Sequence, residues 1–141
     1  MTTEIPKILF LCIGNTCRSI MAQYTAKVLL PEPFKIESAG ISANGSNINP
    51  HAIRLINQKY AFDISEQKSV HIQEKNLSEY TYIISLDTSV TEELKKNNIK
   101  AEKIFQMHME DPVGKDYDTY LKTHAIIENN LKEFMRMERL K

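Results

Sequence analysis

The sequence predicts an α/β fold: a single domain over residues 1–141, with a four-stranded parallel sheet and helices on both faces. The main observation is a fourfold alternation between short apolar runs and segments whose apolar residues recur at helical spacing. Such alternation is typical of open parallel sheets. The length of 141 residues is close to the commonest size of one domain, and a hydrophobic content of 42% is enough for a compact core.

The chain starts with a predicted strand and helix. Residues 7–12 (KILFLC) form an apolar run that ends at a glycine-bearing turn, which is typical of a buried parallel strand. Apolar residues at helical spacing then predict a helix over 18–30. Pro31 and Pro33 stop this helix.

A second strand and helix follow. The strand is expected over 35–38 and is closed by Ala39-Gly40, after which the polar residues 41–50 predict a surface loop. Asn49-Pro50 resembles an N-cap followed by proline at the first helical position. We therefore expect a helix that continues through Ile56.

The second half repeats the alternation. Residues 80–86 (YTYIISL) predict a strong strand, and Thr88 or Ser89 could cap the helix after it. Residues 103–107 predict a weaker strand at the sheet edge. A long helix is expected over 117–140, with one apolar stripe that comprises Tyr120, Ile127, Leu131 and Phe134.

Composition excludes several classes of function. Lysine plus arginine and aspartate plus glutamate both number 18, so nothing attracts nucleic acid or anionic membranes in general. The apolar run 8–13 is too short for a membrane helix or a signal-peptide core. The chain has two cysteines, both near its start, which do not make a disulfide framework. We expect a cytoplasmic protein without nucleic-acid or membrane partners.

The segment 12–19 (CIGNTCRS) carries the chemistry. A cysteine ends the first strand, five residues form a turn, and Arg18 opens a helix. Amides of such a loop can surround an oxyanion, and the helix N-terminus adds free N–H groups. The guanidinium of Arg18 matches two phosphate oxygens. Gly14 and Asn15 tolerate the left-handed backbone that tight cradles tend to need. The predicted phosphate-binding residues are Ile13, Gly14, Asn15, Thr16, Cys17, Arg18 and Ser19.

The same surroundings activate the thiol of Cys12. Helix N-termini and neighbouring cations favour the thiolate, which is the nucleophilic form of cysteine. The Ser19 hydroxyl is well placed in the sequence to donate to that sulfur. We therefore expect Cys12 to attack a bound phosphoryl group.

The same residues also fit other interpretations. A cysteine on a buried strand is usually a small apolar residue, and Cys12 with Cys17 could begin a metal site. However, no second cysteine pair exists and the four histidines lack ligand spacing. A glycine-bearing turn before a helix could also bind a nucleotide. However, the loop has neither the glycine spacing of dinucleotide-binding motifs nor a lysine. No metal and no organic cofactor are expected.

Phosphoryl transfer to sulfur also needs a proton for the leaving oxygen. His124 and the exposed carboxylates are suitable by type, but Asp111 stands out because Pro112 and Gly114 restrict its backbone to a loop. That loop follows the last predicted strand, so it can lie at the sheet edge that holds Cys12. Alternatively, Asp111 is an ordinary turn residue.

These residues resemble the low-molecular-weight protein tyrosine phosphatase family, which also contains the thioredoxin-coupled arsenate reductases. CIGNTCRS is similar to the family signature at every functional position. The resemblance covers essentially the whole domain and includes the segments 38–40 (SAG), 84–87 (ISLD) and 110–112 (EDP).

The resemblance implies a role for each matching residue. Cys12 would be the nucleophile, Arg18 would clamp the phosphoryl group, and Asp111 would act first as general acid and then as base. Asn15 would hold the shape of the loop. Cys17 would lie behind Cys12 as an internal thiol.

Departures from the family pattern concern the substrate. Phosphatases of the family usually carry an aromatic residue after the Asp-Pro pair. In this sequence the residues at that place, 113–115 (VGK), are more similar to those of the arsenate reductases. The segments 38–41 and 49–52 are also more similar to the reductases. Those reductases need further cysteines, and none follows Cys17. Ile13 is the phosphatase-like residue, since threonine there would suggest a phosphoarginine phosphatase.

The expected function is hydrolysis of phosphate monoesters through a cysteinyl-phosphate. Protein phosphotyrosine is the first expected substrate; small phosphate esters and the oxyanions phosphate and arsenate would enter the same loop. One alternative is an arsenate reductase of the same fold that uses an external thiol. Another is an oxyanion-binding regulatory module with little turnover, although a module has no need for the acid Asp111.

Overall fold

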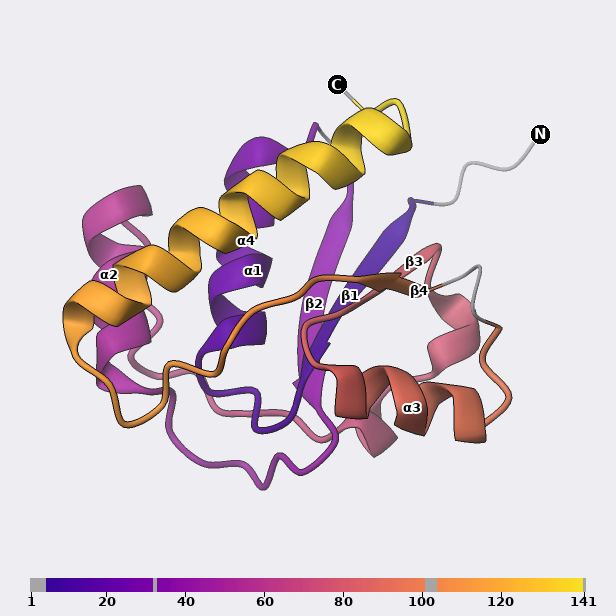
Figure 1. Cartoon of the computed structure of the whole chain (residues 1–141), viewed down its shortest axis with the longest axis horizontal. Coiled ribbons are helices and arrows are strands. Elements are labelled where there is room, and N and C mark those ends of the chain that lie inside the picture. Colours follow the sequence, from indigo (N-terminus) through magenta and orange to yellow (C-terminus); the bar gives the residue numbers. More distant parts are fainter. Residues whose placement is uncertain (1–4, 32, 101–103, 141) are drawn as a thin grey trace.

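Four parallel strands form the centre of the computed structural model (Figure 1). The structure describes residues 5–31, 33–100 and 104–140. The strands lie side by side in the order β2-β1-β3-β4, and every neighbouring pair is parallel. Their bounds are Lys7–Cys12 for β1, Lys35–Gly40 for β2, Tyr82–Ser85 for β3 and Ile104–Gln106 for β4. The predicted α/β fold with a four-stranded parallel sheet is thus confirmed.

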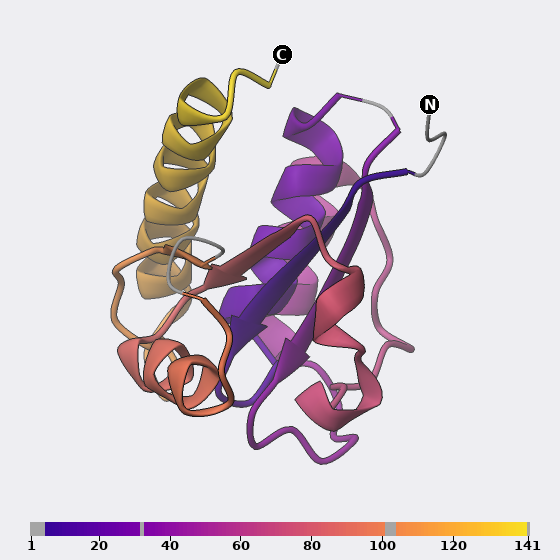
Figure 2. The same cartoon turned by 90° about the vertical axis from the view of Figure 1, so that its right-hand side faces the viewer.

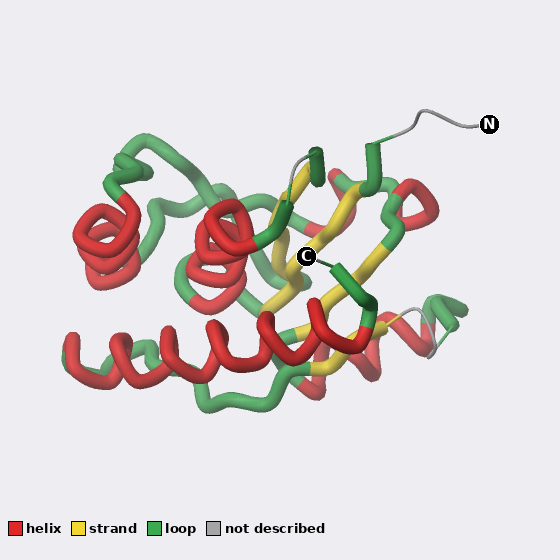
Figure 3. Tube along the Cα trace, turned by 90° about the horizontal axis from the view of Figure 1, so that it is seen from above, coloured by secondary structure: helices red, strands yellow, loops and turns green. Residues whose placement is uncertain are grey.

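Helices cover both faces of this sheet (Figure 2). On one face, α1 and α2 lie side by side and α4 runs across both (Figure 3). The other face carries α3 and two short 3-10 helices that have no counterpart among the predicted elements. The helix bounds are Arg18–Leu29 for α1, Pro50–Tyr60 for α2, Thr88–Lys96 for α3 and Tyr117–Met137 for α4.

The apolar run of β1 is buried on both sides of the sheet, as its composition predicts. Ile8 and Phe10 pack in the core under α1, α2 and α4, whereas Leu9 and Leu11 face the core under α3. The predicted stripe of α4 is confirmed, because all four of its residues are buried. No described helix has the length and apolar composition needed to cross a membrane.

Several boundaries differ from the predictions. β3 is shorter than 80–86, and α4 ends before residue 140. Asp87 caps α3, with its carboxylate accepting from the Ser89 amide at 2.9 Å, so the prediction of Thr88 or Ser89 as the cap is wrong. β4 lies at the predicted edge, and Lys103 of the predicted range lies outside the described residues.

β2 extends beyond its predicted end to Gly40, which lies in register with Cys12. A Cβ at Gly40 would lie 2.5 Å from the Ile13 carbonyl oxygen and 2.9 Å from the Asn15 nitrogen. Only glycine lets β2 approach the loop after β1 so closely. The carboxyl edge of the sheet therefore supports this loop directly.

Candidate active site

The loop after β1 surrounds a cavity of about 160 Å³ at the carboxyl edge of the sheet. Of the predicted site residues, only Ser19 does not line this cavity. Asp111, which comes from the loop between β4 and α4, closes one side together with Val113. The lining residues are Cys12, Ile13, Gly14, Asn15, Thr16, Cys17, Arg18, Asp111 and Val113.

Backbone N–H groups of this loop are free to bind an anion. The amides of residues 13, 14, 16 and 17 have no backbone acceptor among those recorded for the described residues. Cys17 occupies the N-cap position of α1 without a side-chain capping bond, so the first amides of this helix are open as well. Asn15 has the expected left-handed backbone, with φ at 56°. Gly14, the other residue of the loop that tolerates this conformation, does not adopt a positive φ.

The sulfur of Cys12 lies within hydrogen-bond distance of two polar groups. The Asn15 amide donates to Sγ at 3.2 Å, and the Ser19 hydroxyl lies 2.9 Å from Sγ. Both Cys12 and Ser19 are buried, at 2% and 0% exposure. The sulfur is thus buried against one backbone donor and one hydroxyl.

Arg18 is a buried cation held by two carboxylates. Its side chain is 2% exposed, and Nη1 donates to the Leu86 carbonyl at 3.1 Å and to Asp87 Oδ2 at 3.0 Å. Nη2 lies 3.5 Å from Asp111 Oδ2. Because Leu86 and Asp87 occupy both Nη1 hydrogens, Nη2 and Nε remain available to an anion.

Sequence reasoning assigned Asp87 no role. Burial raises the pKa of Asp87, but the hydrogen bonds from Ser89 and the pairing with Arg18 outweigh this and hold the pKa below its ordinary value. Asp87 is therefore a carboxylate at neutral pH and orients Arg18. Its position directly after the third strand, at the edge that holds Cys12, was the available signal.

Asp111 lies at the rim of the cavity. Its side chain is 46% exposed, and Oδ1 accepts from the Val113 amide at 3.1 Å. Gly114 has φ at 83°, as expected of a glycine that shapes this loop. His124, the other acid considered, instead bonds to the hydroxyl of Tyr60 at 2.6 Å and does not line the cavity.

The second thiol, Cys17, is buried beside Asp111. Its Sγ donates to Asp111 Oδ1 at 3.8 Å. Burial, together with the nearby Cys12 and Asp111, raises the pKa of Cys17 to about 12. Cys17 is therefore a thiol at neutral pH.

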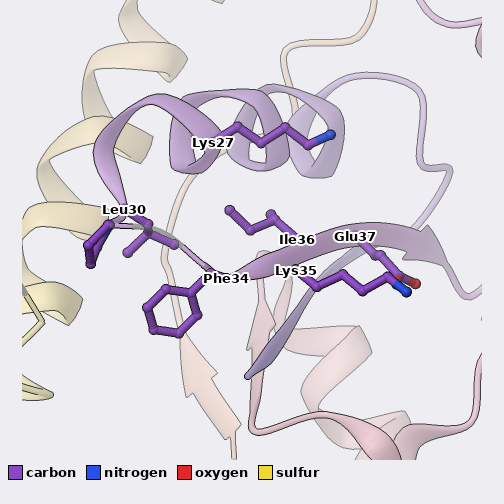
Figure 4. Close-up of a pocket in the computed structure, with 7 residues that line it drawn as sticks. Lys27, Leu30, Phe34, Lys35, Ile36 and Glu37 are labelled. Atoms are coloured by element: carbon purple, nitrogen blue, oxygen red, sulfur yellow. The ribbon is translucent and has the colours of Figure 1, made fainter. Parts of the chain in front are cut away.

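A larger depression of about 420 Å³ lies at the opposite edge of the sheet, where α1 ends and β2 begins (Figure 4). Its lining combines apolar and charged side chains: Leu30, Pro31, Phe34 and Ile36 are apolar, and Lys27, Lys35 and Glu37 are charged. It contains no cysteine or other strong nucleophile. Size alone thus does not mark the reactive site in this molecule.

The sequence is similar to those of known proteins. A family model described as low molecular weight phosphotyrosine protein phosphatase matches residues 7–141. An arsenate reductase from Brevibacillus brevis is 31% identical over 127 residues, which cover 90% of this chain and 92% of that protein.

Solved structures share the fold and the family. The low molecular weight protein tyrosine phosphatase from T. tengcongensis superposes with a TM-score of 0.82 at 25% identity, covering 94% of this chain and 99% of that one. An arsenate reductase in its phosphate binding state gives a TM-score of 0.76 at 26% identity, covering 94% and 98%. Proteins of this fold thus bind phosphate. Since the family model spans nearly the whole sequence, the chain belongs to the low molecular weight phosphotyrosine protein phosphatase family.

Proposed function

We propose that this protein is a cysteine-dependent phosphatase in which Cys12 attacks a phosphate monoester. The observation that carries the proposal is one cavity lined by a hydrogen-bonded cysteine, a buried arginine and a rim carboxylate. These are the nucleophile, the anion clamp and the proton donor that phosphoryl transfer to sulfur requires. Phosphotyrosine in proteins is the first substrate to test.

In the first step, the loop amides and the free edge of Arg18 bind the phosphoryl oxygens. The thiolate of Cys12 forms a bond to phosphorus while the bond to the leaving oxygen breaks, and Asp111 donates a proton to that oxygen. In the second step, water attacks the cysteinyl-phosphate and Asp111 takes its proton. The S–P bond breaks, which releases phosphate and restores the thiolate.

A second candidate is arsenate reduction with an external thiol. The curated arsenate reductase relative favours it over phosphotyrosine hydrolysis. The cavity favours it too, since none of the described residues that line it is aromatic and Val113, at 52% exposure, stands at the rim. Arsenate and phosphate have the same charge and nearly the same shape, so binding alone does not separate the two reactions.

The cysteines argue against a reductase with an internal relay, and leave reduction by an external thiol to the assay below. A relay reductase needs a second thiolate that attacks the cysteinyl adduct. Cys17 is the only other cysteine in the sequence, and a pKa of about 12 leaves almost none of it as thiolate at neutral pH. Hydrolysis, by contrast, needs only Asp111 and a water molecule.

A side-by-side assay tests the proposal. The enzyme is given phosphotyrosine peptide, phosphoarginine peptide, or arsenate with thioredoxin, with glutathione and glutaredoxin, or with mycothiol and glutaredoxin. We expect phosphate release from phosphotyrosine without any reductant, no multiple-turnover arsenite production, and no activity of Cys12→Ser. Steady arsenite production without phosphotyrosine hydrolysis would establish the reductase, and the absence of turnover in every arm would leave a binding module.

A further inference from the structure

The hydroxyl of Tyr120 is a buried donor that the proposed function does not use. Tyr120 lies near the start of α4, which follows the loop of Asp111, and its side chain is fully buried. In the part of the chain that the structure describes, its hydroxyl is the only buried side-chain oxygen or nitrogen without a hydrogen-bond partner. Burying an unpartnered hydroxyl costs free energy on folding, so stability does not account for a tyrosine at this position.

The polar groups near this hydroxyl belong to the reactive cavity. On one side, the ring of Tyr120 packs against the ring of His51, with 4.9 Å between the centroids. Burial and the nearby Cys17 and Asp111 raise the pKa of Tyr120 to about 12, so the hydroxyl keeps its proton at neutral pH and can donate it. The sulfur of Cys17 is a weak acceptor and does not satisfy the hydroxyl. The stronger acceptor nearby is the carboxylate of Asp111.

Asp111 can accept a further hydrogen bond. Its Oδ2 lies 3.5 Å from Arg18 Nη2, and its Oδ1 accepts from the Val113 amide at 3.1 Å. The other donor to Oδ1 is the thiol of Cys17, at 3.8 Å, and a thiol is a weak donor. A phenolic hydroxyl donates more strongly than a thiol, so Tyr120 is the better partner for Oδ1 once the carboxyl approaches it.

Binding of a phosphoryl group changes what holds Asp111. Nη2 of Arg18 is one of the nitrogens that bind the anion in the proposed function, and an anion there competes with Oδ2 of Asp111. A carboxyl that loses its cation holds a proton more readily, which is the form that the first step needs. The side chain of Asp111 is 46% exposed and is therefore free to turn away from Arg18.

We propose that Tyr120 is a positioning residue that donates a hydrogen bond to Oδ1 of Asp111 while an anion occupies Arg18. With Oδ1 held in this way, Oδ2 carries the proton and faces the leaving oxygen. In the second step, the same contact holds the carboxylate while it takes a proton from water. Tyr120 keeps its own proton throughout. The inference rests on the proposed role of Asp111 as acid and base.

The test replaces Tyr120 by phenylalanine, which removes only the hydroxyl. Tyr117→Phe is the matched control, because Tyr117 lies one turn earlier on α4 and its hydroxyl donates to Gln58 at 2.8 Å. Urea unfolding, kinetics on phenyl phosphate and p-nitrophenyl phosphate, and the pH profile of kcat are measured for each protein. Carbon-13 NMR, with the signal assigned by Asp111→Asn, follows the Asp111 carboxyl in the complex with sulfate, a tetrahedral dianion that keeps its charge during the titration.

Tyr120→Phe should resist urea at least as well as the parent, because the hydroxyl that it removes has no partner in the described structure. It should lower kcat for phenyl phosphate by about 3- to 10-fold, the value of one hydrogen bond, and kcat for p-nitrophenyl phosphate by less. A donor favours the carboxylate, so its loss should move the basic limb of kcat and the NMR midpoint of Asp111 to higher pH. Tyr117→Phe should leave kcat and both midpoints in place.

A double-mutant cycle shows whether Tyr120 acts through Asp111. In an Asp111→Asn background, Tyr120→Phe should lower kcat no further. An equal loss in that background, a parental NMR midpoint in Tyr120→Phe, or a marked loss of its stability would overturn the inference. Absence of phosphatase turnover in the parent, with the NMR shift of Tyr120→Phe intact, would instead reject the proposed function and support the contact between Tyr120 and Asp111.

Discussion

At the scale of single residues, the site combines groups that are distant in the sequence. Cys12 and Arg18 come from the first loop, Asp87 follows β3, and Asp111 precedes α4. Arg18 touches both carboxylates, which compensates for burying its charge. The same two contacts orient the guanidinium toward the cavity.

Asp111→Asn removes the proposed proton donor while preserving the size of the side chain. We expect kcat on phosphotyrosine to fall by about 10²–10⁴-fold, the usual contribution of a general acid. The loss should be smaller for p-nitrophenyl phosphate, whose leaving group needs little protonation. Steady-state kinetics on both substrates test this role, and an equal loss on both would remove Asp111 from it.

Much of the site could be predicted because it lies in one short segment. The segment CIGNTCRS contains both the turn and the start of the helix. Pro112 and Gly114 mark the segment around Asp111 as a loop. The contribution of Asp87 could not be predicted in this way. It depends on which side chains meet across different elements, and local spacing does not encode such contacts.

At the scale of elements, Asp87 performs two tasks. Its Oδ1 caps α3 through Ser89, and its Oδ2 pairs with Arg18. Asp87→Asn keeps the cap but loses the charge, whereas Asp87→Ala loses both. We expect Asp87→Ala to lower the free energy of unfolding by about 1 kcal/mol more than Asp87→Asn does.

Urea unfolding and phosphatase assays of the two variants separate these tasks. Both variants should weaken phosphate binding, because Arg18 loses the carboxylate that orients it. Equal stabilities would show that the cap contributes nothing, and unchanged phosphate affinity would show that Asp87 does not position Arg18.

Existence and order of the main elements could be predicted more reliably than their ends. The apolar periodicity of β1 and α4 reflects burial that is spread over whole elements. Ends depend on individual contacts, such as the register of Gly40 with Cys12 and the capping bond of Asp87. The 3-10 helices are three residues each, too short to show a period.

At the scale of the whole molecule, His124 joins α4 to α2 through Tyr60. Burial and the nearby Lys59 hold the pKa of His124 below its ordinary value of 6.5. At a pH between the lowered pKa in the folded protein and 6.5, His124 binds more protons in the unfolded chain than in the folded one. The contribution of His124 to the free energy of unfolding is therefore fully present above about pH 6.5. It is lost as the pH falls toward the pKa of His124 in the folded protein.

His124→Gln removes this dependence while keeping a polar side chain. Urea unfolding between pH 5 and pH 8 should show a steeper loss of stability on acidification for the parent than for the variant. One titrating group contributes at most about 1.4 kcal/mol per pH unit. Parallel curves for the two proteins would show that His124 does not take up a proton on unfolding.

In the proposed mechanism, the phosphoryl group leaves its ester as a covalent adduct of Cys12, which water then hydrolyses. Rapid acid quench of the enzyme with phosphotyrosine peptide, followed by peptide mass spectrometry, tests it most directly. We expect one phosphoryl group on Cys12, formed and lost at rates consistent with kcat without any reductant, and none on Cys12→Ser. Turnover with no phosphoryl group on Cys12, or an adduct that only an added thiol discharges, would contradict the account.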